Sequence, residues 1–247
     1  MRKKIVAANW KMNMNVKEAK SLCKTLLPLV KTNDKTVVFC VPSIDITEVG
    51  KMLKGTNVKL GAQNMFYEEK GAYTGEISAD MLLSTGVEYV IIGHSERRQI
   101  FKENDVMINK KIKKAITSGL IPIMCVGETL TQREKNETLD HIKNQLEKGL
   151  KSVSKEEIKN VVLAYEPIWA IGTGHTATSK QAEEVCAYIR KVLTEMYDKK
   201  TADEVSILYG GSVNEKNAKE LFSKKNIDGG LIGGASLKPE FAEIVSA

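Results

Sequence analysis

Residues 161–178 read VVLAYEPIWAIGTGHTAT and combine an apolar run, one carboxylate and an apolar loop. The run at residues 161–165 is short and apolar, which is typical of a strand buried on both faces. Glu166 follows it, and Pro167 ends the strand because proline has no N–H and disfavours helix for the residue before it. Trp169 then lies in a loop that ends in two glycines. We interpret Glu166 as a general base beneath a closing lid; the alternative is a surface loop with an incidental glutamate.

Short apolar runs alternate with longer amphipathic segments along the whole chain. We predict strands at residues 5–8, 36–41, 59–63, 89–93, 121–126, 161–165, 206–209 and 230–232. We predict helices at residues 16–30, 44–53, 79–85, 105–118, 130–150, 179–197, 215–224 and 239–245. Ser179 is the expected N-cap of its helix, and Gly86 and Gly119 are expected at helix C-caps. Strict alternation predicts right-handed βαβ units and a parallel sheet.

Periodicity alone does not separate a closed barrel from an open doubly wound sheet, but the polar residues at the strand ends do. Reactive residue types follow nearly every predicted strand: Asn9 and Lys11, Asn64, His94, Glu128, Glu166, Ser212, and Gly233 with Gly234. A closed barrel brings all these strand ends to one mouth, whereas an open sheet spreads them along its width. We therefore predict an α/β fold in which residues 1–247 form a single (β/α)8 barrel domain.

Composition excludes several classes of protein. The 247 residues are 42% hydrophobic and 28% charged, and the net charge of +6 is spread along the chain among acidic residues. This pattern indicates a solvated surface and no nucleic-acid partner. The cysteines show no CxxC spacing and are expected to be reduced thiols of a cytoplasmic protein: Cys23, Cys40, Cys125 and Cys186. We find neither a signal peptide nor an apolar run that would span a membrane.

Lys11 and His94 are candidates for binding and polarising an anionic substrate. Lys11 lies just past a buried strand and could direct its ammonium group into the barrel mouth, although a surface lysine is the alternative. His94 opens a predicted helix, where the positive end of the dipole is expected to lower its pKa and keep it neutral. The alternative is a histidine that only satisfies backbone groups. No two of the three histidines have metal-ligand spacing, so we expect no metal site.

Glycine-bearing turns follow the last three strands at residues 172–174, 210–212 and 233–234. Glycine lets the backbone approach a ligand closely, and the adjoining helix starts present N–H groups suited to phosphate. GTGHTA at residues 172–177 also fits a dinucleotide-binding fingerprint. That motif needs its glycines directly at the strand end and an acidic strand terminus about 20 residues on, whereas Glu195 lies inside a predicted helix. We therefore disfavour a dehydrogenase.

The chain resembles the triosephosphate isomerase family over essentially its whole length. The resemblance lies in AANWKMN, VIIGHSERR, AYEPIWAIGTG, YGGSV and GGLIGGASL, in this order. It implies an enzyme of glycolysis and gluconeogenesis that interconverts dihydroxyacetone phosphate and D-glyceraldehyde 3-phosphate through an enediolate. It also implies Lys11 as the electrostatic anchor, His94 as the electrophile and Glu166 as the base. No cofactor is implied, because hydrogen only moves between adjacent carbons.

The resemblance implies further site residues. Asn9, which also contacts substrate, and Ser95 act as supports, and Glu96 supports the lysine anchor. The substrate phosphate is held by the backbone N–H groups of Gly172, Ser212, Gly233 and Gly234. One residue departs from the family pattern, since His175 stands where the second hinge of the lid usually has lysine.

Residues 64–78, NMFYEEKGAYTGEIS, form a long predicted loop with three aromatic residues. Loops of this length are uncommon unless they are functional. By resemblance, the loop inserts into a second subunit and brings Thr74 near that subunit's Lys11 and His94. We therefore expect a homodimer, and some family members form tetramers.

Two other classes of protein remain as alternatives. A different phosphosugar barrel enzyme, such as a lyase of the tryptophan pathway, would have no reason to carry Glu166 and Pro167 ahead of this loop. A non-catalytic scaffold should have lost Lys11, His94 or Glu166, and all three are present.

Overall fold

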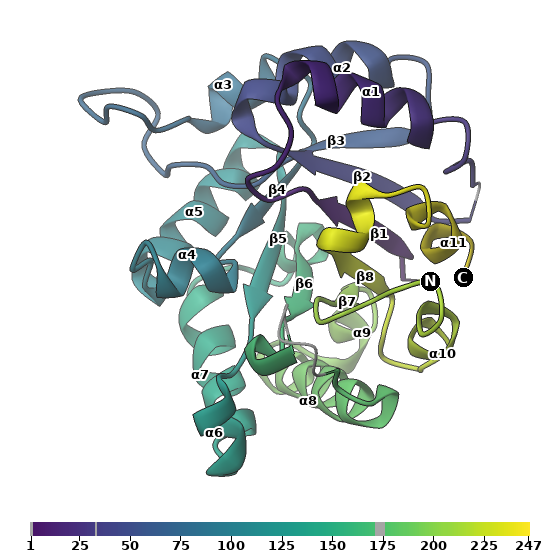
Figure 1. Ribbon diagram of the computed structural model, residues 1–247. Helices are drawn as coiled ribbons and strands as arrows, with labels where there is room; N and C mark the ends of the chain where they lie inside the picture. The colour runs from purple at the N-terminus through teal and green to yellow at the C-terminus, as the bar shows by residue number, and fades with distance from the viewer. Residues whose placement is uncertain (1, 33, 171–175) are drawn as a thin grey trace.

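Eight parallel strands close into a barrel in the order β1 to β8, and β1 pairs with both β2 and β8 (Figure 1). The structure, a computed structural model, describes residues 2–32, 34–170 and 176–247. The strands are β1 Ile5–Asn9, β2 Thr36–Val41, β3 Val58–Ala62, β4 Tyr89–Ile92, β5 Ile121–Val126, β6 Val162–Tyr165, β7 Ile207–Tyr209 and β8 Gly229–Ile232. The closed barrel confirms the predicted fold class.

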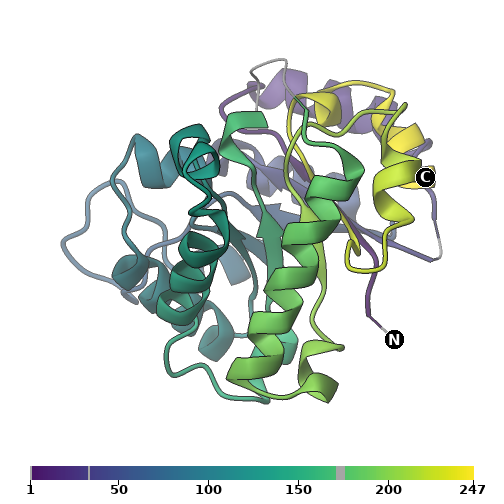
Figure 2. The same ribbon diagram turned by 90° about the horizontal axis from the view of Figure 1, so that it is seen from below.

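Helices surround the barrel in both views (Figures 1 and 2). The α-helices are α1 Val16–Leu26, α2 Ile46–Leu53, α3 Ala79–Leu83, α4 Ser95–Gln99, α5 Asp105–Ser118, α6 Leu130–Glu134, α7 Thr138–Gly149, α8 Ser179–Met196, α9 Lys199–Ala202, α10 Ala218–Phe222 and α11 Phe241–Ser246. The 3-10 helices are η1 Ser43–Asp45, η2 Glu157–Asn160, η3 Ile168–Ala170 and η4 Gly234–Leu237. Most predicted helices are present, but several are shorter than expected.

Local backbone chemistry explains where the helix predictions succeed and fail. Gly119 ends α5 in the left-handed conformation, with φ of 90°, as predicted. The helix predicted at residues 130–150 is instead two helices, because Asn136 between them has φ of 58°. Ser179 is not the N-cap of α8. Thr178 caps it, because Thr178 and Gln181 form a reciprocal capping box.

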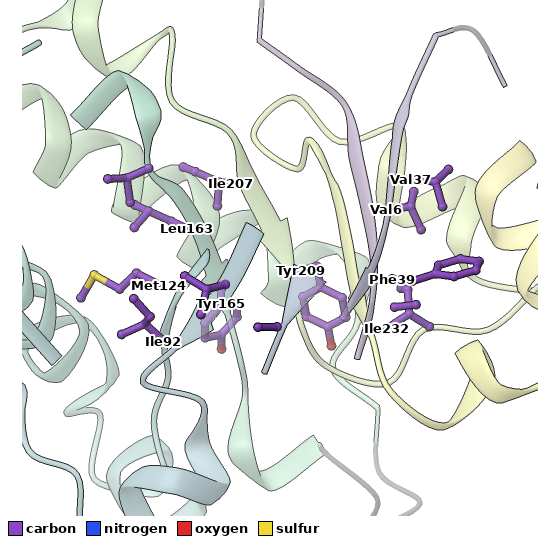
Figure 3. Close-up of a cluster of buried hydrophobic side chains, with 14 of the residues drawn as sticks. Val6, Val37, Phe39, Ile92, Met124, Leu163, Tyr165, Ile207, Tyr209 and Ile232 are labelled. Atoms are coloured by element: carbon purple, nitrogen blue, oxygen red, sulfur yellow. The ribbon is translucent and has the colours of Figure 1, made fainter. Parts of the chain in front are cut away.

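The side chains of the strands form two separate buried layers. One row points into the barrel and includes Ala7, Cys40 and Ile91. The other row packs outward against the helices, and Figure 3 shows part of this layer, including Phe39 and Tyr209. Because strand side chains alternate with a period of two, every strand except β3 contributes to both layers, and β3 contributes only to the outward one.

Two structural features are absent from the described residues. In residues 2–32, 34–170 and 176–247, no helix is both long and apolar enough to cross a membrane. The same part of the chain contains no group of three or more His, Cys, Asp or Glu side chains that could hold a metal ion.

Closure of the barrel depends on Gly229, where β8 meets β1. Ile5 is aligned with Gly229, whose φ is 132°, and a Cβ on Gly229 would lie 1.9 Å from the Ile5 carbonyl oxygen.

We predict that Gly229→Ala destabilises the protein far more than Gly119→Ala. The control substitution meets nothing within 4 Å, so it should cost only the left-handed penalty of about 1–2 kcal/mol. Urea unfolding of both variants measures the difference, and equal losses would show that the seam tolerates the clash.

Candidate active site

The alternation of strand side chains carries polar groups into the barrel mouth. On β6, Val162 and Ala164 point into the barrel, and Glu166 is the next residue of that row. Asn9 extends the inward row of β1 in the same way. The inward rows thus end in groups that can meet a ligand, while the outward rows are committed to packing.

A hollow of about 430 Å³ opens at this mouth. Its lining includes every described residue that the sequence predicted as catalytic or substrate-binding: Asn9, Lys11, His94, Glu166, Ser212, Gly233 and Gly234. Gly172 and His175 lie outside the described residues, as does most of the predicted lid. The structure therefore gathers residues from five separate strand ends in one place.

His94 reaches the hollow because Gly93 redirects the chain. Tyr89 and Ile91 form the inward row of β4, so simple alternation would point His94 outward. Gly93 has φ of 73°, and His94 becomes the N-cap of α4. Its Nδ1 accepts the Glu96 N–H at 3.2 Å, which places the proton of the neutral ring on Nε2.

Glu166 and His94 form a buried pair at the centre of the site. His94 Nε2 lies 2.8 Å from Glu166 Oε1, and the Ser95 N–H donates to Glu166 Oε2 at 2.9 Å. Burial raises the pKa of Glu166. His94 and the Ser95 N–H lower this pKa by more than burial raises it, so the net pKa lies below 4.5. Glu166 is therefore an ionised carboxylate at neutral pH.

The same contact changes what we expected of His94. Burial lowers the pKa of His94, whereas the charge and hydrogen bond of Glu166 raise it, and the net pKa lies above 6.5. The expectation of a lowered pKa is therefore wrong for this arrangement. His94 does lie at a helix N-terminus, as predicted. The sequence pattern gave no sign that the Glu166 carboxylate contacts its ring.

Lys11 is held at the mouth by an unusual backbone conformation. Its φ is 54°, in the left-handed region that residues other than glycine rarely adopt. The Lys11 N–H donates to Asn9 Oδ1 at 3.1 Å, and the Gln63 side chain donates to the Lys11 carbonyl at 2.9 Å. Lys11 Nζ lies 2.6 Å from Glu96 Oε1. These contacts fix both the backbone and the ammonium group.

Glycines leave room around the charged groups. A Cβ on Gly210 would lie 2.9 Å from Glu166 Cγ, and one on Gly233 would lie 3.4 Å from Lys11 Cε. Gly234 begins η4, so its N–H has no partner within that turn. The Ser212 hydroxyl donates to the Ala170 carbonyl at 2.6 Å, which ties the turn after β7 to the end of η3.

Two polar residues at strand ends lie elsewhere than sequence reasoning placed them. Glu128 belongs to the outward row of β5 and is buried, where it accepts hydrogen bonds from Tyr165 and Trp169. Asn64 is also an outward residue and accepts from Lys111 Nζ at 2.8 Å. Gln63, the preceding inward residue, was missed. The period of two along β3 was the signal that distinguishes Gln63 from Asn64.

The long loop after β3 projects away from the barrel (Figure 1). Thr74 is exposed on it. Aromatic stacking stiffens the loop, because the Phe66 ring centroid lies 4.2 Å from that of Tyr67 and 4.7 Å from that of Tyr73. Lys110 on α5 lies 4.8 Å above the Tyr67 ring. The loop is therefore built as an ordered projection.

Comparison with known proteins identifies close relatives. Residues 4–247 match the family described as triosephosphate isomerase. The chain is 56% identical over 240 residues to triosephosphate isomerase of Alkaliphilus oremlandii, with 97% of each chain covered. It is 54% identical over 247 residues to the proteins of that name from Thermoanaerobacter pseudethanolicus and Clostridium botulinum, with 100% of each chain covered.

The contact between His94 and Glu166 yields a direct test. We predict that His94→Leu raises the pKa of Glu166 above its wild-type value, because burial then outweighs the remaining Ser95 N–H. Carbon-13 NMR titration of the labelled glutamate carboxyls measures this pKa, and Glu166→Gln identifies the resonance. A Glu166 pKa unchanged in the variant would show that the pair does not interact as the geometry indicates.

Proposed function

The chain belongs to the triosephosphate isomerase family and interconverts dihydroxyacetone phosphate and D-glyceraldehyde 3-phosphate, and we propose that Glu166, His94 and Lys11 carry out this reaction. The observation that supports the assignment is their convergence on one hollow, with an ionised carboxylate 2.8 Å from an imidazole nitrogen. We also propose that residues 1–247 act as one catalytic domain.

Glu166 is the base of the proposed mechanism. Its carboxylate takes a proton from the carbon next to the substrate carbonyl and returns it to the neighbouring carbon. To do so, it exchanges its hydrogen bonds with His94 and Ser95 for a position over the substrate. The open backbone of Gly210 beside Glu166 Cγ leaves space for that movement. No cofactor takes part, since hydrogen moves only between adjacent carbons.

His94 and Lys11 stabilise the negative charge that develops on the substrate oxygens. When Glu166 leaves the ring, the main cause of the raised His94 pKa is lost, and only the smaller effect of Glu96 remains. Burial and the helix N-terminus then favour the neutral ring, whose Nε2–H remains available as a donor. The Lys11 ammonium group attracts the dianionic substrate and the enediolate. Preorganised donors of this kind supply much of the rate enhancement in enzymes.

The phosphate group is proposed to bind where the turns after β7 and β8 meet the hollow. Gly233 lies beside the Lys11 side chain, and Ser212, Gly233 and Gly234 line the hollow. In the proposed mode their backbone N–H groups donate to phosphate oxygens. Barrels often bind phosphate at this position. Gly172, outside the described residues, completes the proposed set.

Cellular context follows from the chemistry and the cysteines. We place the enzyme in glycolysis and gluconeogenesis, which use both triose phosphates. All four cysteines are free and buried, which supports a reducing compartment, and we propose the cytoplasm.

A homodimer is the proposed assembly. Met12, next to Lys11, is 97% exposed, an unfavourable position for a large apolar side chain in a monomer. A second hollow of about 310 Å³ lies here, lined by residues that include Lys11, Gln63 and Arg97. The projecting loop around Thr74 is an occupant of suitable shape from a second copy, which would bring Thr74 near the partner's Lys11.

Shortening the base tests its role. Glu166→Asp keeps the charge but retracts the carboxylate by about one bond, and misplacement of about 1 Å can cost on the order of 100-fold in rate. We expect kcat to fall on that scale while KM changes little, in a coupled assay on glyceraldehyde 3-phosphate. Retention of most of the turnover would exclude Glu166 as the base.

The dimer is tested by placing a cation at the loop tip. The arginine of Thr74→Arg should repel the Lys11 ammonium group of a second subunit. We expect this variant to sediment as a monomer in sedimentation velocity and to be weakly active in the coupled assay. Thr25→Arg, at an exposed site on α1, is the matched control and should leave the assembly unchanged. A wild-type monomer with full activity at nanomolar concentration would contradict the proposal.

A further inference from the structure

Gln145 and His141 of α7 both act on the turn that follows β5. Gln145 Oε1 accepts the Gly127 N–H at 2.9 Å. The Gly127 backbone raises the pKa of His141, so the dipole of its carbonyl group acts on the ring. His141 and Gln145 are four residues apart on one helix, so their side chains lie on the same face.

The turn formed by Gly127 and Glu128 supports the proposed base. A Cβ on Gly127 would lie 1.8 Å from the Glu166 carbonyl oxygen, so the two backbones are in direct contact. Glu128 Oε1 accepts from Trp169 Nε1 at 2.9 Å, and its carbonyl accepts from the Ile168 N–H at 3.1 Å. A displacement of the turn therefore reaches both Glu166 and η3.

Hydrogen bonds fix the ring of His141 in one neutral form. Gln132 Oε1 accepts the Thr129 N–H at 2.9 Å as part of the capping box of α6. The amide nitrogen of Gln132 therefore faces His141 Nδ1, 2.9 Å away. An amide N–H₂ group can only donate, so Nδ1 accepts and the ring proton sits on Nε2. Nδ1 can accept this hydrogen bond only while the imidazole is neutral.

We propose that His141, in its neutral form, is a positioning residue for isomerisation, which holds the turn of Gly127 and Glu128 against Glu166. A proton on Nδ1 would face the Gln132 amide donor. Rotating that amide to relieve the conflict would turn a donor toward the Thr129 N–H and break the capping box. Protonation of Nδ1 therefore either sets two donors against each other or breaks the capping box at Thr129, the residue that follows Glu128. The inference rests on the proposed role of Glu166 as the base.

The surroundings of His141 oppose protonation near neutral pH. Burial lowers the pKa of His141 below 6.5, and the Arg98 guanidinium of α4 lowers it as well. The Gly127 carbonyl, Asp105 at the start of α5, and Glu137 before α7 act in the opposite direction. His141 is therefore neutral at neutral pH, and we expect the turn of Gly127 and Glu128 to loosen only under mildly acidic conditions.

The coupling can be observed without any activity measurement. The chain has two tryptophans and three histidines, so indole and imidazole resonances are readily assigned by NMR. We expect the Trp169 Nε1–H resonance to shift with the same midpoint as the His141 imidazole. Glu128, whose pKa burial raises, also titrates beside Trp169. The transition of the Trp169 resonance that reports His141 is therefore the one that disappears in the His141→Leu variant.

Two variants test the consequence for catalysis. His141→Leu should lower kcat by about tenfold at pH 7.5, on the scale of a sub-ångström displacement of the base, while thermal unfolding confirms the fold. Asp140→Asn, exposed and adjacent on α7, is the control and should retain wild-type kcat. Gln132→Glu places a carboxylate at Nδ1, so it should raise the His141 pKa and move the acidic loss of kcat to higher pH.

Three outcomes separate the possibilities. A Trp169 resonance that does not follow the His141 titration in the wild type would overturn the proposal, and so would wild-type kcat in a folded His141→Leu variant. An active Glu166→Gln variant would instead refute the assignment of the base, while the NMR coupling between His141 and Trp169 would stand.

Discussion

Closure of the barrel is the constraint on which the site depends. Because β1 pairs with β8 as well as β2, all eight strands end at one mouth. The side-chain period of two then decides which residue at each strand end faces that mouth. Glu166 and Asn9 are inward by this rule, while Glu128 is outward and supports the chain from behind. His94 is the exception, and Gly93 supplies the change of direction.

Burying charge is the second constraint. Glu166 is 2% exposed and His94 is 6% exposed, and an isolated charge in such a place is strongly unfavourable. The buried pair is tolerated because His94 and Glu166 contact each other, and the Ser95 N–H donates a hydrogen bond to the second carboxylate oxygen. In the proposed mechanism the substrate replaces these partners, so the contacts that stabilise the carboxylate also compete with the substrate for it. Lys11 differs, since its charge is partly solvated and its strain lies in the backbone.

Much of this arrangement is predictable from sequence, because strand and helix periods are local properties. Both bounds of α5 and the eightfold alternation follow from hydrophobic pattern and glycine placement. What the pattern misses are contacts between strands. The raised pKa of His94 requires knowing that Glu166 reaches across the mouth, and the role of Gln63 requires knowing that Lys11 lies beside β3. The break at Asn136 was also missed, since the amphipathic pattern continues through it.

Lys11 joins the proposed catalytic site to the proposed subunit interface. It lines both the hollow at the mouth and the second hollow, which the exposed Met12 also lines. Gln63, which holds the Lys11 carbonyl, lines the second hollow too. A partner loop seated there would exclude water from the hydrogen bonds that maintain the left-handed backbone of Lys11, and hydrogen bonds strengthen in a low-dielectric environment. The proposed dimer would therefore act on the position of the Lys11 ammonium group. A monomer would keep the proposed catalytic residues and lose their alignment.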